Sequence, residues 1–326
     1  MPSRAALRKY LPPLLGLVLF GAAAWFIYHE VRGFPYYEVG DYLSRLPLLN
    51  IGWGIVLTAL NFVILSGYDV LALRFAHRRL AYRRVLLASF IGYSFSHALG
   101  GALVTGGSVR YRLYSEWDVD PYTIATTVVF GGVSFWIGLL SIGSLLLFME
   151  PPALVGALEM KQHAWMVGIL IGLPVVAYVV TAAVRSRPVR LMGTVLPMPK
   201  LWMIPVQVGL AALELMVTAA VLYILLPTSA SIPFFYVVGA FVLALSAGVL
   251  SQIPGGLGVF DGLLLLLLQP YLETSTIAGV LLAFRGIFHL LPLVISALML
   301  GLYEALQWSD ETSSPISEWS TSTEDA

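Results

Sequence analysis

The sequence predicts an all-α, polytopic integral membrane protein with about six full transmembrane helices and two broken or re-entrant hairpin elements. The first observation is composition: of 326 residues, 59% are hydrophobic and only 11% are charged, whereas about a quarter of a soluble domain is charged. The mean hydropathy is +0.86. The second observation is a series of eight long apolar runs, at 11–31, 48–73, 85–109, 122–149, 163–184, 201–226, 233–272 and 274–305.

The first apolar run follows Arg4, Arg8 and Lys9, a pattern shared by signal peptides and first transmembrane helices. Its length suits a bilayer core, which takes about 20 apolar residues, and no small-residue cleavage motif follows it. We therefore interpret 11–31 as the first transmembrane helix.

Polar segments separate the runs. Segment 32–47 is polar and aromatic and suits an interfacial loop or short helix, whereas 74–84 and 185–200 are strongly basic. The end of the chain is rich in Ser, Thr, Glu and Asp, a composition that does not support a packed core. We expect one transmembrane domain over 1–308 and a disordered, acidic cytoplasmic tail over 309–326.

The run 85–109 is predicted to be a re-entrant hairpin, because Lys and Arg collect in short cytoplasmic loops. If this run crosses the membrane and the N-terminus is cytoplasmic, 9 basic residues lie inside and 8 outside. If it enters from the cytoplasm and returns, the count becomes 14 inside and 3 outside, with Arg285 excluded because it lies within a helix. The second arrangement obeys the charge rule and the first does not.

The run 233–272 is long enough for two helical arms joined at Pro254, Gly255 and Gly256. These arms either span the membrane fully or form a deep hairpin from the outer side. Both arrangements bring the last helix from the outside inward, so the N- and C-termini are predicted to be cytoplasmic. Two interrupted helices in one membrane protein are a sequence indication of a transport site.

The first candidate site follows the hairpin. Gly106, Gly107 and Ser108 have the composition of a loop that feeds a helix, with Ser108 as its N-cap and free N–H groups for an anion. Arg110 and Arg112 add forked donors that match phosphate oxygens. The alternative is that both arginines are interfacial residues that merely obey the charge rule.

The second candidate site is the break at Pro254, Gly255, Gly256 and Gly258, with Asp261 one turn into the following helix. An acid near a helix N-terminus is favoured by the helix dipole alone. Within a membrane segment, however, ionisable side chains usually face a bundle interior or a cavity. We therefore include all five residues among those expected to line a cavity within the bundle.

Three further charges lie within apolar runs. Glu214 and Arg285 are far from the ends of their runs, where a lone charge costs several kcal/mol, so we predict that they pair. This pair either lines the expected cavity or is a structural salt bridge between two helices. Asp69 is closer to the cytoplasmic end and is expected to pair with Arg74 or Arg78.

The remaining polar groups give no catalytic or metal-binding pattern. Asn61, His97 and His289 are expected to form hydrogen bonds between helices. The chain has no cysteine and shows no His/Asp/Glu spacing typical of a metal site and no Ser/His/acid set. It also has no nucleotide-binding loop, so neither a cofactor nor ATP-driven pumping is expected, and no nucleic acid partner is indicated.

The two motifs together resemble a known family. Gly106 to Tyr114 (GGSVRYRLY) is similar to the flippase part of bacterial lysylphosphatidylglycerol synthase/flippase proteins, and Ile253 to Val259 (IPGGLGV) resembles its second signature. Arg285 followed by Pro292 resembles the family's C-terminal pattern. The likeness extends over about 5–308. It implies a multi-pass domain of the bacterial inner membrane that moves phospholipid, including aminoacylated phosphatidylglycerol, between leaflets.

The resemblance leaves other functions open, because bifunctional members continue into a cytosolic aminoacyl-transferring domain and this chain ends in a polar tail. One alternative is a membrane enzyme that modifies a lipid, with Asp261 or Glu214 as general base. Another is a non-catalytic membrane partner of a separate lipid synthase. The expected ligand is a membrane phospholipid, and a separate synthase or a second copy of the chain is retained as a partner.

Overall fold

The computed structural model describes residues 46–149, 163–184, 189–191, 194–196, 199–251 and 256–313, apart from Leu257, and also Gly21 and Ser44. The predicted first helix and the interfacial segment 32–47 therefore lie almost wholly outside the described residues. The tail after Ser313 lies outside them as well.

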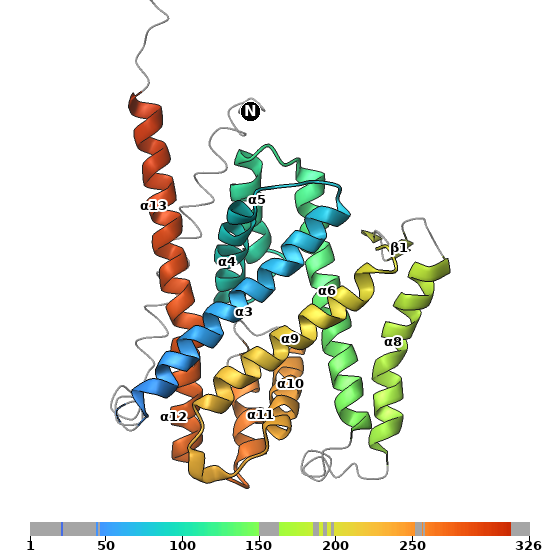
Figure 1. Cartoon of the computed structure of the whole chain (residues 1–326), viewed down its shortest axis with the longest axis vertical. Coiled ribbons are helices and arrows are strands. Elements are labelled where there is room, and N and C mark those ends of the chain that lie inside the picture. Colours follow the sequence, from blue (N-terminus) through green and yellow to red (C-terminus); the bar gives the residue numbers. More distant parts are fainter. Residues whose placement is uncertain are drawn as a thin grey trace, which may run out of the picture.

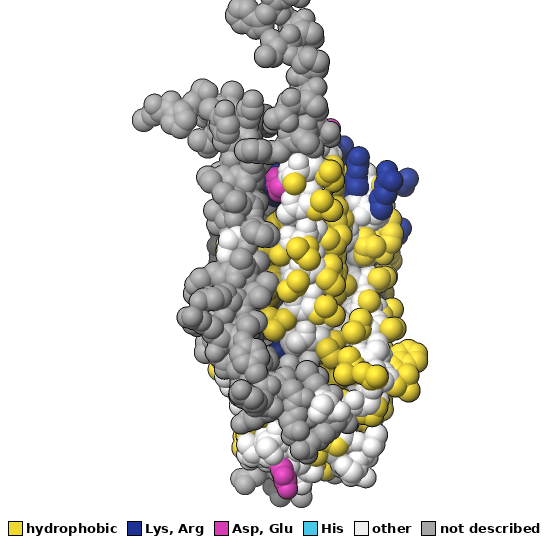
Figure 2. All heavy atoms as spheres, turned by 90° about the vertical axis from the view of Figure 1, so that its left-hand side faces the viewer, with side chains coloured by type: hydrophobic (Ala, Val, Ile, Leu, Met, Phe, Trp, Pro, Cys, Tyr) yellow, Lys and Arg dark blue, Asp and Glu magenta, His cyan; other side chains and the backbone are white. Residues whose placement is uncertain are grey.

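Five helices of the described part are long and apolar enough to cross a membrane, and they confirm the multi-pass helical class. They coincide with predicted runs: α3 (Leu48–Phe75), α6 (Pro121–Phe148), α8 (Ala164–Val184), α9 (Met203–Ile224) and a last helix from Thr274 onward. Hydrophobic side chains cover the lateral face in Figure 2, and the Lys and Arg side chains in that view gather near its upper end. Such a face suits contact with lipid tails.

The start of α6 illustrates how the sequence ends one element and begins the next. Asp120 is the N-cap, and its carboxylate accepts hydrogen bonds from the backbone N–H and the hydroxyl of Thr123. These hydrogen bonds lower the pKa of the Asp120 carboxyl. Pro121 follows at the first helical position, where its missing N–H is not needed.

Two hairpins of shorter helices enter the bundle from opposite ends (Figure 1). The first consists of α4 (Tyr82–Leu99) and α5 (Thr105–Glu116), and the second of α10 (Phe234–Leu250) and α11 (Val259–Leu268). The 12 residues of α5 extend about 18 Å, well short of a bilayer core of ~30 Å. α4 and α5 thus fold back on each other, as the predicted hairpin requires, although its second arm extends beyond the predicted run 85–109 to Glu116, and α10 and α11 also fold back as a hairpin.

The break in the first hairpin lies at Gly100 and Gly101, and the loop predicted at Gly106 and Gly107 is absent. Gly100 and Gly101 have φ of 72° and 59° and separate the two arms. This left-handed region is readily accessible to glycine and costly for most other residues. Gly106 and Gly107 are instead helical residues of α5.

The chain contains the same order of elements twice, in opposite directions. A long helix, a hairpin and a second long helix form α3–α4–α5–α6. The same series recurs as α9–α10–α11 and the long helical stretch that begins with α12 (Thr274–Phe284) (Figure 1). The leading helices α3 and α9 cross as an antiparallel pair. The side chain of Asn50 donates to Ile224 O at one end, and Thr218 meets Asn61 nearer the middle.

The last long helix is interrupted. After α12 comes a π-helical segment, η3 (Arg285–Leu290), and then α13 (Leu291–Ser313). Pro292 explains this break, because it has no N–H to donate and its ring clashes with the carbonyl four residues earlier, that of Phe288. The widened turn places Arg285 and His289 within one short segment at the centre of the bundle.

Two small elements complete the described fold. β1 (Val189–Leu191) and β2 (Thr194–Leu196) form an antiparallel hairpin within the predicted basic loop 185–200, where no strand was expected. A short 3₁₀ turn, η1 (Thr228–Ala230), precedes α10. The larger hydrophobic core lies around α10 and α11, and a second core packs α4 and α5 against α13.

Candidate functional site

The first hairpin is fastened to α3 by a buried ion pair. Arg110 Nε and Nη2 donate to the two carboxylate oxygens of Asp69, each over 2.9 Å. Ser89 and Tyr114 also donate to this carboxylate, over 2.7 and 3.2 Å. The side chains of Arg110 and Asp69 are 5% and 1% exposed. The expectation that Asp69 pairs with Arg74 or Arg78 is therefore wrong.

Two glycines make room for the guanidinium of Arg110. A Cβ built on Gly92 of α4 would stand 2.9 Å from Arg110 Nη1, and one on Gly106 of α5 would stand 3.0 Å from the same atom. The third donor of Arg110, Nη1, is used by Gly106 O at 3.2 Å, and Tyr93 stacks on the guanidinium at 4.5 Å. Each of the three nitrogens of the Arg110 guanidinium thus donates to a protein group in this conformation.

The predicted loop and the predicted N-cap are both absent from this motif. Ser108 is not an N-cap: α5 begins at Thr105 after Val104, so Ser108 lies in the first turns of the helix. Gly107 does not adopt positive φ, and a Cβ there would meet Val128 at an ordinary 3.6 Å. The tightly packed glycine of this pair is Gly106, because a Cβ there would collide with Ser96 Oγ and would also approach Arg110 Nη1 to 3.0 Å.

Arg112 is also buried within the protein, at 2% exposure. Its Nε and Nη2 donate to the two carboxylate oxygens of Glu304 in α13, each over 2.8 Å, and it pairs with Glu116 one turn along α5. Tyr303 donates in turn to Glu116. This network fastens the first hairpin to the last helix, 192 positions away in the chain.

The second hairpin carries its own ion pair. Arg285, at the start of η3, donates through Nε and Nη2 to the carboxylate of Asp261, over 3.1 and 2.5 Å. The Asp261 side chain also accepts the N–H of Gly258, the N-cap of α11, at 3.2 Å. Gly256 and Gly258 have φ of 65° and 80°, so the predicted break is present. Pro254 and Gly255 lie outside the described residues.

This second pair is more accessible than the first, since the side chains of Arg285 and Asp261 are 11% and 26% exposed. The predicted partnership of Arg285 with Glu214 is wrong. Asp261 is nearer, and it sits at a helix N-terminus where its charge is already favoured. The same carboxylate therefore caps α11 and binds the arginine.

Glu214 lies instead in a buried polar cluster formed by residues of α3, α4 and α9. Its Oε1 is 3.4 Å from the hydroxyl of Thr218, which lies 3.3 Å from Asn61 Oδ1. His97 and His289 have ring centroids 6.5 Å apart. The expected interhelical hydrogen bond is present for Asn61, while Nδ1 of each histidine has no partner among the described residues.

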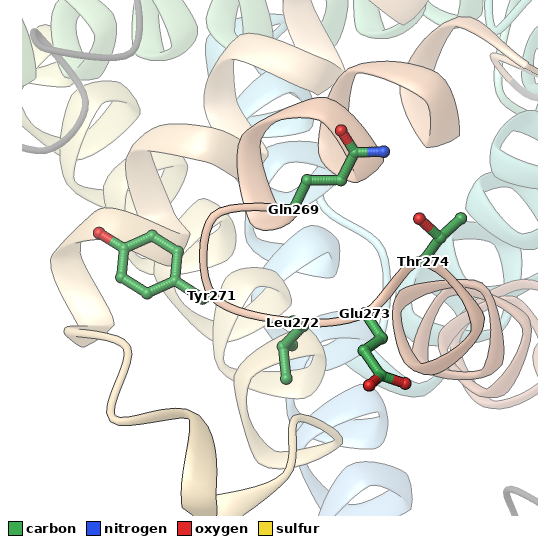
Figure 3. Close-up of a pocket in the computed structure, with 5 residues that line it drawn as sticks. All are labelled: Gln269, Tyr271, Leu272, Glu273 and Thr274. Carbon is green, nitrogen blue, oxygen red and sulfur yellow. The ribbon is translucent and has the colours of Figure 1, made fainter.

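A surface depression of about 660 Å³ lies in the loop between α11 and α12, and it offers no comparable chemistry. Figure 3 shows that the side chains lining it point in different directions instead of converging: Gln269, Tyr271, Leu272, Glu273 and Thr274. Across the described ranges, no group of three His, Asp or Glu side chains is placed to hold a metal ion. The candidate site is therefore the set of charges at the two hairpins.

The architecture and the buried charges agree with the result of a comparison with protein families. A family model described as the lysylphosphatidylglycerol synthase transmembrane region matches residues 14–296. The chain belongs to this family. The match extends over both hairpins and the π segment, and it ends before the C-terminal part of α13.

The similar proteins are of two kinds: some are about as long as this chain, and others are much longer. Protein slr0712 of Synechocystis is 30% identical over 92% of this chain and 94% of its own length. Inner membrane protein YbhN of Escherichia coli is 27% identical, over 82% and 83%. Phosphatidylglycerol lysyltransferase of Staphylococcus xylosus is 24% identical over 92% of this chain, which spans only 35% of that longer protein.

Proposed function

We propose that this member of the lysylphosphatidylglycerol synthase transmembrane family moves phospholipid between the two leaflets of a bacterial inner membrane. The observation that carries the proposal is the pair of opposed hairpins, each tied by an arginine–aspartate pair to a helix of the bundle. Repeated elements of opposite direction and broken helices near the bilayer middle are features of transporters that expose a site to either side.

The physical demand of lipid transfer supports the same function. A headgroup needs polar contacts at a depth where its acyl chains remain in hydrocarbon, and irregular backbone is tolerated there only inside protein or beside water. The breaks at Gly100–Gly101 and Gly256–Gly258 supply such backbone. The aminoacylated phosphatidylglycerol implied by the resemblance is one lipid within this proposed substrate class.

Arg285 is the residue we expect to meet the headgroup phosphate. Arg110 has its donors occupied within a packed glycine cradle, whereas Arg285 lies beside a carboxylate that is 26% exposed. A phosphate that replaces Asp261 would meet the same planar fork of donors. Asp261 would remain in place as the cap of α11, which limits the rearrangement that binding requires.

The proposed sidedness places the basic loops in the cytoplasm. The loops that follow α3, α5 and α8 lie at the same end of the molecule, where the C-terminal part of α13 also ends (Figure 1). Basic loops face the cytoplasm in most membrane proteins. The N- and C-termini are therefore proposed to be cytoplasmic, with the α4–α5 hairpin opening inward and the α10–α11 hairpin outward.

The test is reconstitution of the purified chain into liposomes with fluorescent phosphatidylglycerol or phosphatidylethanolamine. Loss of signal after a membrane-impermeant quencher measures the fraction of lipid in the outer leaflet. We expect faster exchange than in protein-free liposomes and no change in the lipid itself. Chromatography of the same samples checks the alternatives: a modified lipid indicates an enzyme, and neither exchange nor modification indicates a partner of a separate synthase.

A further inference from the structure

Several buried polar atoms in and near the Glu214 cluster have no hydrogen-bond partner among the described residues. Among the described residues, five side chains here have a buried atom without a partner: Asn61 Nδ2, Tyr68 OH, His97 Nδ1, Glu214 Oε2 and His289 Nδ1. Buried polar atoms in native proteins are nearly always paired, so each exception calls for a physical reason. Here the exceptions are concentrated on one carboxyl group and its surroundings.

The contacts of Thr218 show what is missing. Its hydroxyl carries one hydrogen, yet it faces three acceptor oxygens: the backbone O of Glu214 at 2.9 Å, Asn61 Oδ1 at 3.3 Å and Glu214 Oε1 at 3.4 Å. Exchanging the amide O and N of Asn61 still leaves one atom of that amide unpaired. The Thr218 hydroxyl therefore cannot serve all three oxygens, and Glu214 Oε2 has no partner among the described residues.

No cation of the described structure supplies the missing charge. Glu214 is 6% exposed, and the three buried arginines bind other carboxylates: Arg110 that of Asp69, Arg112 that of Glu304, and Arg285 that of Asp261. A buried carboxylate without a counter-charge is very costly, and uptake of a proton removes that cost. A proton bound to Glu214 also makes its carboxyl group a hydrogen-bond donor.

Packing around Glu214 disfavours a larger ligand. One turn before it, α9 approaches its neighbours so closely that a Cβ on Gly138 of α6 would overlap Ala211. On the other side, a Cβ on Gly67 of α3 would stand 2.9 Å from Leu210. A proton needs no such space, whereas a metal ion or an ammonium group needs both volume and several converging oxygens.

We propose that Glu214 is a binding site for an exchangeable proton, and that lipid exchange is coupled to movement of that proton across the membrane. The coupling rests on the proposed lipid transport, whereas the proton site stands on the cluster alone. The titratable groups that interact with Glu214 are Tyr68 of α3 and Tyr93 of α4, and Asp69 lies beside Tyr93. His97 of α4 forms a separate set with His289 and Arg285 of η3. The helices packed on α9 are α3, α6, α10 and α12, and α12 carries no titratable side chain. Helices α6 and α10 contribute one tyrosine each, Tyr122 and Tyr236, the first exposed and the second bonded to Leu267 O.

The location gives the proton a means to act on both hairpins. His97 lies near the tip of α4 and His289 in η3, and Phe288 stacks on His97 with centroids 5.7 Å apart. On the other side Phe284 stacks on Phe288 at 5.2 Å and on Phe260 of α11 at 6.2 Å. A continuous row of rings thus joins the two hairpins, and we propose that a change of charge at Glu214 acts through it.

The proton site is tested by infrared difference spectroscopy of the purified chain in detergent while the pH is changed. We expect a carbonyl band of a protonated carboxyl group that persists at neutral pH in the wild type and is absent in Glu214→Gln. Glu273→Gln, at an exposed glutamate, is the matched control and should keep the band. A wild-type spectrum that lacks the band, or a band that Glu214→Gln retains, would overturn the proposal.

The coupling is tested in liposomes that carry a pH gradient and an enclosed pH-sensitive dye. If one proton moves per lipid, a gradient of one pH unit can shift the steady-state leaflet ratio by up to about tenfold. We expect this shift and a matching dye signal in the wild type, and neither in Glu214→Gln. A shift that follows a sodium gradient at constant pH would replace the proton with a metal cation and contradict the proposal.

These two measurements separate the proton site from the transport function. If no variant exchanges lipid but the Glu214 band is present, the proposed function fails and the proton site stands. If lipid exchange is normal and independent of any pH gradient, transport stands and the coupling fails.

Discussion

Asp69 of α3 and Arg110 of α5 are 41 positions apart in the chain and meet through two hydrogen bonds of 2.9 Å. Almost none of either side chain is exposed. The pair therefore fastens α5 to α3, and it stabilises the fold only when both partners are present.

Loss of either partner should destabilise the protein strongly. Asp69→Asn and Arg110→Gln each leave a buried charge uncompensated, a change typically worth about 3–5 kcal/mol. The double variant should lose less than the sum, because the two sites act as a unit. Thermal melting of the purified protein in detergent measures these effects. Asp118→Asn, at an exposed position, should melt like the wild type, and additive losses would show that the pair is not coupled.

The glycine cradle predicts a contrast between neighbouring glycines. Gly92→Ala and Gly106→Ala place a Cβ within about 3 Å of the Arg110 guanidinium and should lower the melting temperature. Gly107→Ala meets only Val128 at 3.6 Å, and in a helix alanine is favoured over glycine by about 1 kcal/mol. That variant should therefore be neutral or more stable. Equal losses at Gly106 and Gly107 would contradict the role of the cradle.

The second ion pair should govern transport more than stability. Arg285→Lys keeps the charge but not the planar fork, so exchange should fall about tenfold or more if the fork binds phosphate. Arg285→Gln should abolish exchange. Arg79→Gln, which removes an exposed charge, is the control. Leaflet exchange is measured with expression and melting temperature recorded in parallel, and normal exchange in Arg285→Gln would refute the assignment.

The hairpin arrangement predicts which loops are accessible from outside. The chain has no cysteine, so single cysteines can be introduced without a background. Cysteines at Arg79 and Asp118, on either side of the α4–α5 hairpin, should both be protected from an impermeant thiol reagent in intact cells. A cysteine at Glu273, at the opposite end, should react. Protection at only one of the first two positions would mean that the hairpin crosses the membrane.

The hairpin could be predicted from sequence because its signal is global. The positions of five long helices follow from hydropathy, and the return of 85–109 follows from where the basic residues of the whole chain must lie. The location of the break could not be predicted in the same way. Two glycine pairs lie six positions apart, and only tertiary packing shows that Gly100–Gly101 opens the chain while Gly106 accommodates an arginine.

The ion pairs were harder to predict because partners are chosen by distance in space. Arg285 was paired with Glu214, since both lie deep in apolar runs, yet Asp261 is closer and is held in place by Gly258. Arg112 binds Glu304, 192 positions away, at a place that hydropathy marks as an interface. The available signal was that three arginines in or near apolar runs require three acids at similar depth.

Both hairpin pairs share one arrangement along the chain: Asp69 precedes Arg110, and Asp261 precedes Arg285. A ribosome therefore delivers each acid before its arginine. An aspartate can enter hydrocarbon as the neutral acid, whereas an arginine keeps its charge throughout. Each arginine thus reaches the membrane after an aspartic acid that can release its proton and pair with the arginine. We therefore expect the order of synthesis to lower the free-energy barrier to inserting these charges. A variant that carries both Asp69→Arg and Arg110→Asp keeps the same two charges in reversed order and should insert less efficiently.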